Sequence, residues 1–133
     1  MAPTTAAAMV AAARQRIANL SVDQVAAELA RGETLLVDVR EPEERAEEGA
    51  IPGAVPAARG LIEFYADPTS PCHRPEFDPS QPAILYSATG GRSALAAEAL
   101  RRLGYTRIAH LDGGLKAWKD AGRPVVPVAP GST

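Results

Sequence analysis

Short, almost continuously apolar runs recur along this chain, and each is followed by a segment with helical periodicity. The runs are TLLVDV (34–39), AILY (83–86) and RIAHL (107–111). Such runs are typical of strands that are buried on both faces of a parallel sheet. AVPA (54–57) follows a Pro-Gly turn and is predicted as a further short strand. The pattern therefore predicts a parallel sheet.

Amphipathic helices are predicted between these runs. Residues 22–31 follow a capping box formed by Ser21 and Gln24 and place apolar side chains on one face. Residues 92–103 and 114–122 repeat this pattern, with Trp118 facing inward. Shorter helical segments are expected in the acidic stretch 41–49 and around 60–67, and a longer alanine-rich one over roughly 5–18. Strands that alternate with helices predict an α/β fold with helices on both faces of the sheet and right-handed crossovers.

The segment SATGGR (87–92) is the candidate functional loop, because it joins a buried strand to a helix. In α/β sheets, ligands collect beyond the carboxyl ends of the strands. Gly90 and Gly91 allow the loop to turn its amide groups inward, and the following helix end and Arg92 add positive potential. A plain strand-to-helix turn with a solvated arginine is the alternative. If the loop is functional, it predicts an anion cradle with Ser87 at its entrance.

A hydroxyl at position 87 raises a chemical difficulty. A thiol in such a cradle ionises easily, whereas a serine needs an adjacent base. The two histidines, His73 and His110, are far apart in sequence, and nothing in the sequence requires either to approach Ser87. A serine-dependent hydrolase is therefore a weak alternative, for which ester hydrolysis would be the sign.

Composition argues against several other classes of protein. The chain has 133 residues, a net charge of −2 and one cysteine, Cys72. This predicts one domain, no internal disulfide, no metal site, no cofactor and no nucleic-acid partner. No stretch approaches the ~20 apolar residues of a membrane span, and the N-terminus lacks the charge order of a secretory signal. A cytoplasmic protein without a membrane partner is the expectation.

Four segments of the chain together resemble the rhodanese superfamily. YSATGGRSALAAEALRRLGY is similar to the active-site segment, which normally reads Cys-x-x-Gly-x-Arg-Ser. LLVDVREPEE, EGAIPGAVPA and LDGGLKAWKDAGRPV resemble the other segments, in the same order, so that the resemblance spans about residues 20–126. ARGLIEFYADPTSPCHRPEF is similar to the single-domain polysulfide and thiosulfate sulfurtransferases. The resemblance implies a three-layer fold with a five-stranded parallel sheet.

The resemblance also implies a function. The expected reaction moves sulfane sulfur from thiosulfate or polysulfide, through a cysteine persulfide, to a thiol or cyanide. The four residues between Ser87 and Arg92 favour sulfur, because related phosphatases have a loop that is one residue longer. By position, Ser87 and Arg92 correspond to the catalytic cysteine and arginine. The expected substrate-binding residues are Ala88, Thr89, Gly90, Gly91, Ser93, Arg59 and Arg40.

Ser87 departs from the family pattern, because a serine cannot form a persulfide. Two explanations stay open: a deliberate Cys-to-Ser change that stops turnover, and a natural domain that has lost catalysis and binds or regulates instead. Asp38 is expected to fix Arg40 or the loop, Trp118 to lie in the core, and Cys72 to be incidental.

The expected division of the chain is an N-terminal helical extension (1–19), a rhodanese-like domain (20–126) and a C-terminal tail (127–133). The N-terminal helix has no obvious place in the sheet, and it is therefore predicted to pack across a subunit boundary and support a homodimer.

Overall fold

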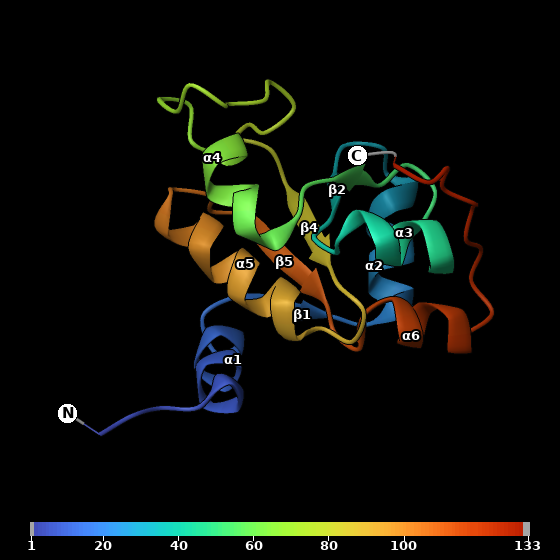
Figure 1. Cartoon of the computed structure of the whole chain (residues 1–133), viewed down its shortest axis with the longest axis horizontal. Coiled ribbons are helices and arrows are strands. Elements are labelled where there is room, and N and C mark those ends of the chain that lie inside the picture. Colours follow the sequence, from blue (N-terminus) through green and yellow to red (C-terminus); the bar gives the residue numbers. More distant parts are fainter. Residues whose placement is uncertain (1, 132–133) are drawn as a thin grey trace.

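A computed structural model gives the structure of the protein and describes residues 2–131. Its centre is a five-stranded parallel sheet in the order β1-β5-β4-β2-β3 (Figure 1). The strands are β1 (Ala18–Leu20), β2 (Leu35–Asp38), β3 (Val55–Pro56), β4 (Ala83–Tyr86) and β5 (Ile108–Leu111). The predicted α/β class and parallel sheet are confirmed, and the apolar runs form β2, β4 and β5, the three inner strands.

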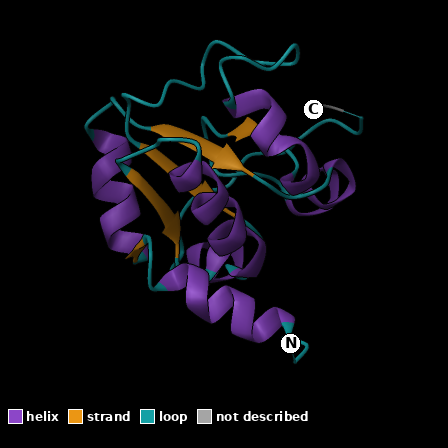
Figure 2. Cartoon of the chain, turned by 90° about the vertical axis from the view of Figure 1, so that its left-hand side faces the viewer, coloured by secondary structure: helices purple, strands orange, loops and turns teal. Residues whose placement is uncertain are grey.

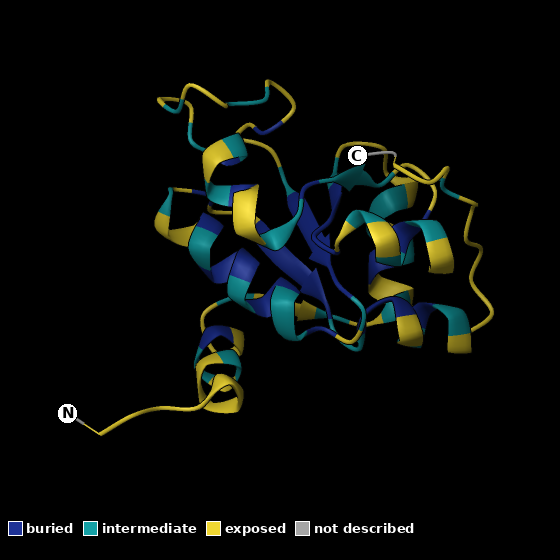
Figure 3. Ribbon diagram, in the orientation of Figure 1, coloured by how far each residue is buried: buried dark blue, intermediate teal, exposed yellow. Residues whose placement is uncertain are grey.

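Helices cover both faces of the sheet (Figure 2). They are α1 (Ala6–Arg14), α2 (Val22–Ala30), α3 (Pro42–Glu48), α4 (Ile62–Ala66), α5 (Gly91–Arg102) and α6 (Gly114–Asp120), with a 3-10 turn, η1, at Arg59–Leu61. One apolar cluster joins α4 and α5 to one face of the sheet, and a second joins α2 and α6 to the other. The three inner strands are accordingly among the most deeply buried parts of the chain (Figure 3), and Trp118 lies in the second cluster as predicted.

The N-terminal segment differs from the sequence prediction. The helix expected over roughly 5–18 ends at Arg14, and β1 follows and pairs with β5 through Ala18 and Ala109. β1 lies at the sheet edge, and its first two residues are exposed. It therefore carries no apolar run by which the sequence could have identified it.

Helix α1 lies outside the sheet but packs within its own chain, and its role in a homodimer stays a prediction. It packs against α5 of its own chain, at the lower left of Figure 1, and buries Ala13. Arg14 pairs with Asp112 at 2.8 Å, and Asn19 Nδ2 donates to the Arg14 carbonyl. These contacts stabilise α1 on the body of the domain without a partner subunit.

The residues after α6 are held to the domain at two points. Trp118 Nε1 donates to the Pro124 carbonyl, and Val126 forms an antiparallel bridge with Ala50. These contacts extend to Val126, directly before the predicted tail, and residues 132–133 of that tail lie outside the described residues. Within residues 2–131, no helix is long and apolar enough to cross a membrane.

The contact between α1 and α5 can be tested with a charge at the buried position. Ala13→Glu should lower the free energy of unfolding by about 2 kcal/mol, because it places a carboxylate in an apolar contact. The matched control is Ala11→Glu, at an exposed position of the same helix, which should change it by less than about 0.5 kcal/mol. Urea denaturation measures both, and equal effects of the two substitutions would contradict the packing.

Candidate active site

The loop between β4 and α5 is fixed by close backbone packing against the start of α6. Leu115 N donates to the Ser87 carbonyl at 2.9 Å, and Lys116 N donates to the Ala88 carbonyl at 3.1 Å. A Cβ on Gly114 would lie 2.6 Å from the Ala88 carbonyl, so only glycine fits there. Gly90 has φ 109°, a conformation that glycine tolerates, and it turns the loop into the helix. The loop is thus shaped before any ligand binds.

Two backbone amides converge on the Ser87 side chain. Its Oγ accepts from Gly90 N at 3.3 Å and from Ser93 N at 3.2 Å, and the residue is 1% exposed. Gly90 is the N-cap of α5 and Ser93 lies in its first turn, where amides have no partner within the helix. This arrangement stabilises negative charge on the atom at the tip of residue 87. It provides hydrogen-bond donors and no base.

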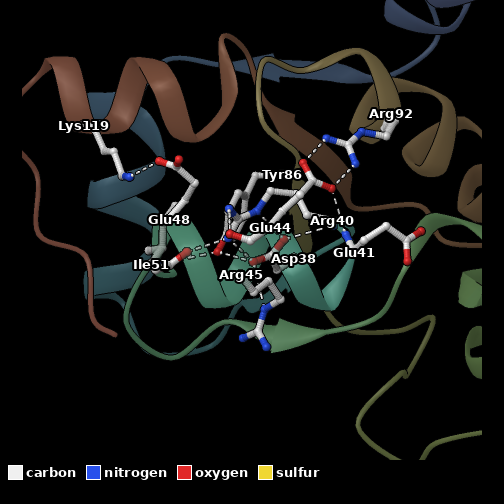
Figure 4. Close-up of polar contacts among 11 residues, drawn as sticks. Asp38, Arg40, Glu41, Glu44, Arg45, Glu48, Ile51, Tyr86, Arg92 and Lys119 are labelled. Atoms are coloured by element: carbon white, nitrogen blue, oxygen red, sulfur yellow. Dashed lines mark hydrogen bonds and ion pairs between the residues drawn. The ribbon is translucent and has the colours of Figure 1, made fainter. Parts of the chain in front are cut away.

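Arg92 lies at the loop but is turned toward α3. Its Nη1 and Nη2 donate to the two carboxylate oxygens of Glu44 at 2.6 and 2.8 Å (Figure 4). Hydrogen bonding from Arg92 lowers the pKa of Glu44 to about 2. No hydrogen bond between the Arg92 guanidinium and Ser87 is among the contacts of residues 2–131. Arg92 therefore contributes its charge next to the cradle, with Glu44 as its counter-charge.

A pocket of about 390 Å³ lies beside the loop and between α3 and α6; we call it the loop-side pocket. Ala88 and Thr89 contribute the loop's share of its wall, and Lys119 pairs with Glu48 across it at 2.8 Å. Arg40 lines the pocket from beneath, at 2% exposure. Its guanidinium donates to Asp38 and to the Gly49 carbonyl, so Asp38 fixes Arg40, which was one of the two predicted roles.

Arg59 lies elsewhere. Its Nη1 donates to Glu63 at 3.0 Å, and it lines a groove of about 520 Å³ between α1, α5 and η1. None of residues 87–92 lines this groove. Cys72 is exposed in the connection between α4 and β4, and the neighbouring His73 bonds to the Phe77 carbonyl. Within residues 2–131 no group of three potential metal-ligating side chains is present.

His110 is the residue near the loop that the sequence did not single out. It is fully buried on β5, and its Nδ1 lies 2.9 Å from Ser93 Oγ, while its Nε2 lies 2.7 Å from Asn19 Oδ1. Because Asn19 Nδ2 donates to backbone carbonyls, its Oδ1 is the acceptor, and His110 therefore carries its proton on Nε2. Ser93 Oγ–H then donates to Nδ1. Only the long-range pairing of β5 with β1 brings these side chains together.

Burial makes this histidine a source of acid sensitivity. Desolvation lowers the pKa of His110 from 6.5 to about 4, so the unfolded chain binds a proton before the folded one does. Through this group alone, the free energy of unfolding should fall by about 3 kcal/mol as the pH drops from about 6.5 to about 4, and this contribution levels off below that. His110→Gln should remove this contribution, whereas His73→Gln should keep the wild-type slope. Urea denaturation across this pH range measures the slopes, and an unchanged slope in His110→Gln would contradict the burial of a neutral ring.

Known proteins resemble this chain both in sequence and in structure. The chain is 35% identical over 94 residues to a protein named sulfurtransferase from Allochromatium vinosum, covering 71% of this chain and 79% of that one. A solved structure from Rhodopseudomonas palustris, of unknown function and described as a possible tyrosine phosphatase, is 36% identical with a TM-score of 0.89, covering 95% of this chain and 97% of that one. The polysulfide-sulfur transferase homodimer of Wolinella succinogenes is 26% identical with a TM-score of 0.72, covering 95% and 90%.

The family model described as the rhodanese-like domain matches residues 21–121, which include every strand from β2 to β5 and the whole loop. The fold and the sequence relationship agree, and the chain belongs to the rhodanese-like domain family, whose members include sulfurtransferases.

Proposed function

We propose that the protein is built for sulfur transfer from thiosulfate or polysulfide to a thiol or cyanide, and that the Ser87 form is inactive. The observation that carries this proposal is the pair of amides on Ser87 Oγ, in a site without a base. Such a site favours an atom that is already negative, as a thiolate is, and does not activate a hydroxyl. The catalytic group would be a cysteine at position 87.

The reaction would proceed in two displacements. A thiolate at position 87 attacks the outer sulfur of thiosulfate, the sulfur–sulfur bond of the donor breaks, and sulfite leaves with the bonding electron pair. A persulfide remains on residue 87, and the Gly90 and Ser93 amides stabilise its negative charge. An acceptor thiolate or cyanide then attacks the terminal sulfur and regenerates the thiolate. Both displacement steps use the same hydrogen-bond donors, the Gly90 and Ser93 amides.

The size of the loop supports sulfur over phosphate. Four residues lie between Ser87 and Arg92, and Gly114 packs against Ala88, so the loop cannot widen without losing that contact. The neighbouring structure described as a possible tyrosine phosphatase makes phosphate esters the obvious control substrate. We propose that an acceptor approaches residue 87 from the loop-side pocket, whose wall includes Ala88 and Thr89. We further propose a cytoplasmic location, where reduced acceptor thiols are available.

A second candidate is a natural binding or regulatory module. Ser87 itself favours it, because the hydroxyl is buried and accepts two hydrogen bonds without strain elsewhere in the loop. In that case the loop binds a small anion or a partner without turnover. A homodimer, as in the Wolinella succinogenes relative, fits either candidate. Light scattering on the purified protein would give twice the monomer mass.

Restoring sulfur at position 87 distinguishes the two candidates. Ser87→Cys should gain thiosulfate:cyanide or polysulfide:thiol sulfurtransferase activity, and intact-mass spectrometry should show one added sulfur on residue 87 after donor treatment. The Ser87 protein should show neither, and Cys72 should take no sulfur. A folded Ser87→Cys protein without activity or persulfide would favour the binding module. Turnover of phosphate esters instead of thiosulfate would contradict the choice of sulfur.

Arg92 should matter more than Arg59 for anion binding. In the Ser87 protein, which should bind thiosulfate without cleaving it, Arg92→Ala should weaken thiosulfate binding by roughly tenfold or more, because it removes a positive charge and leaves Glu44 unpaired beside the cradle. Arg59→Ala should have a smaller effect, since Arg59 is paired with Glu63 in another groove. Titration calorimetry measures both, and the added Glu44→Gln change should recover part of the loss. Equal binding by the Arg92→Ala and parent proteins would contradict this arrangement.

A further inference from the structure

A buried polar cluster beneath α3 contains more positive than negative charge. Asp38 is fully buried and accepts from Arg40 Nε and Nη2 at 3.0 and 2.7 Å, from Arg45 Nε at 3.1 Å and from Tyr86 Oη at 2.8 Å. Burial raises the pKa of Tyr86, so its phenol is neutral. Two buried guanidinium groups, on Arg40 and Arg45, therefore share one carboxylate. Glu44 and Glu48 lie close enough to Arg40 to interact with its charge, so Arg45 is the guanidinium that water or an anion has to satisfy.

Arg45 is the member of the cluster with unused donors. Arg40 uses its Nη2 on Asp38 and on the Gly49 carbonyl, but Arg45 is bonded only through Nε. Neither Nη1 nor Nη2 of Arg45 has a hydrogen-bond or ion-pair partner among residues 2–131, although its side chain is only 7% exposed. Figure 4 shows these two nitrogens turned away from Asp38 and from the other side chains drawn. Their direction identifies where a partner would lie.

Arg45 lines a second, small pocket beside α3, and it does not line the loop-side pocket. The pocket measures about 190 Å³, and its lining includes Arg45, Arg74, Tyr65, Pro56, Ala58 and Glu41. Arg74 is held there because its Nη1 donates to the Pro56 carbonyl, its guanidinium stacks on Tyr65 at 4.9 Å and its Nη2 pairs with Glu76 at 2.6 Å. Glu41 is the acidic residue of the lining, and it is exposed. We call this the Arg45 pocket.

We propose that the Arg45 pocket is a second anion site, which binds a small oxyanion such as sulfate, phosphate or a carboxylate group. The planar fork of Nη1 and Nη2 matches two oxygens of one anion, which a halide cannot provide. The bound charge would pair with the outward side of the Arg45 guanidinium. A volume of about 190 Å³ holds such an anion together with a few waters, given about 30 Å³ per water. None of residues 87–92 lines the pocket, so this inference does not depend on the proposed function.

Nuclear magnetic resonance can observe the two anion sites separately. Titration of ¹⁵N-labelled protein with potassium sulfate, against potassium chloride at equal ionic strength, should give saturable shifts at amides 43–45 and 57–58 with sulfate only. Arg45→Lys should raise the dissociation constant for sulfate, measured at these amides, at least ~10-fold. The single ammonium group of the lysine would pair with Asp38, and no second pair of N–H donors would face the pocket. Shifts at amides 88–93 should be unchanged. Arg31→Lys, at an exposed position outside both sites, is the matched control and should bind as the wild type does.

Phosphate and acetate titrations then separate an inorganic anion from a carboxylate group as the preferred ligand. If Arg45→Lys does not fold, Ala58→Glu provides an independent variant that keeps Arg45 and places a carboxylate in the pocket wall; it should abolish the sulfate shifts and raise the melting temperature. Shifts with sulfate no larger than those with chloride would overturn the proposal. So would sulfate binding at amides 43–45 that is unaffected by both Arg45→Lys and Ala58→Glu.

Discussion

The buried carboxylate of Asp38 is the interaction on which the arrangement of the site depends. It lies at the end of β2 and is bonded to Tyr86 at the end of β4 and to Arg45 on α3. It therefore fixes the position of α3 relative to the two strands that flank the active site. Removing its charge would leave two buried guanidinium groups unpaired, at a cost of roughly 3–5 kcal/mol. Because α3 is fixed, Glu44 meets Arg92 at the start of α5.

The chemistry of the loop follows from which groups are present around residue 87. Amide donors at the helix end stabilise an anion, and Arg92 adds charge that is partly balanced by Glu44. The nearest imidazole, that of His110, is directed at Ser93 and is held neutral by burial. It therefore does not act as a base toward Ser87. A thiolate needs only the donors, whereas a hydroxyl needs the missing base, and this difference favours the proposed sulfur transfer over hydrolysis.

Much of the fold was predictable because its signal is local. Apolar runs marked β2, β4 and β5, and the two glycines before Arg92 marked the loop. β1 was missed because it is a three-residue edge strand whose first two residues are exposed, so that its pairing with β5 is what defines it. The links between Arg92 and Glu44, and between His110 and Asn19, join residues 48 and 91 positions apart. No spacing rule relates such residues, and the topology of the sheet had to be known first.

The central claim is that the loop is built to hold a thiolate at position 87. The direct measurement is the thiol pKa of a Ser87→Cys protein in a Cys72→Ser background, followed by thiolate absorbance or by the rate of alkylation against pH. The account predicts a pKa at least about 2 units below the ordinary thiol value of about 8.5, because two amides, the helix end and Arg92 all favour the anion. A folded protein whose residue 87 titrates at or above about 8.5 would contradict the account.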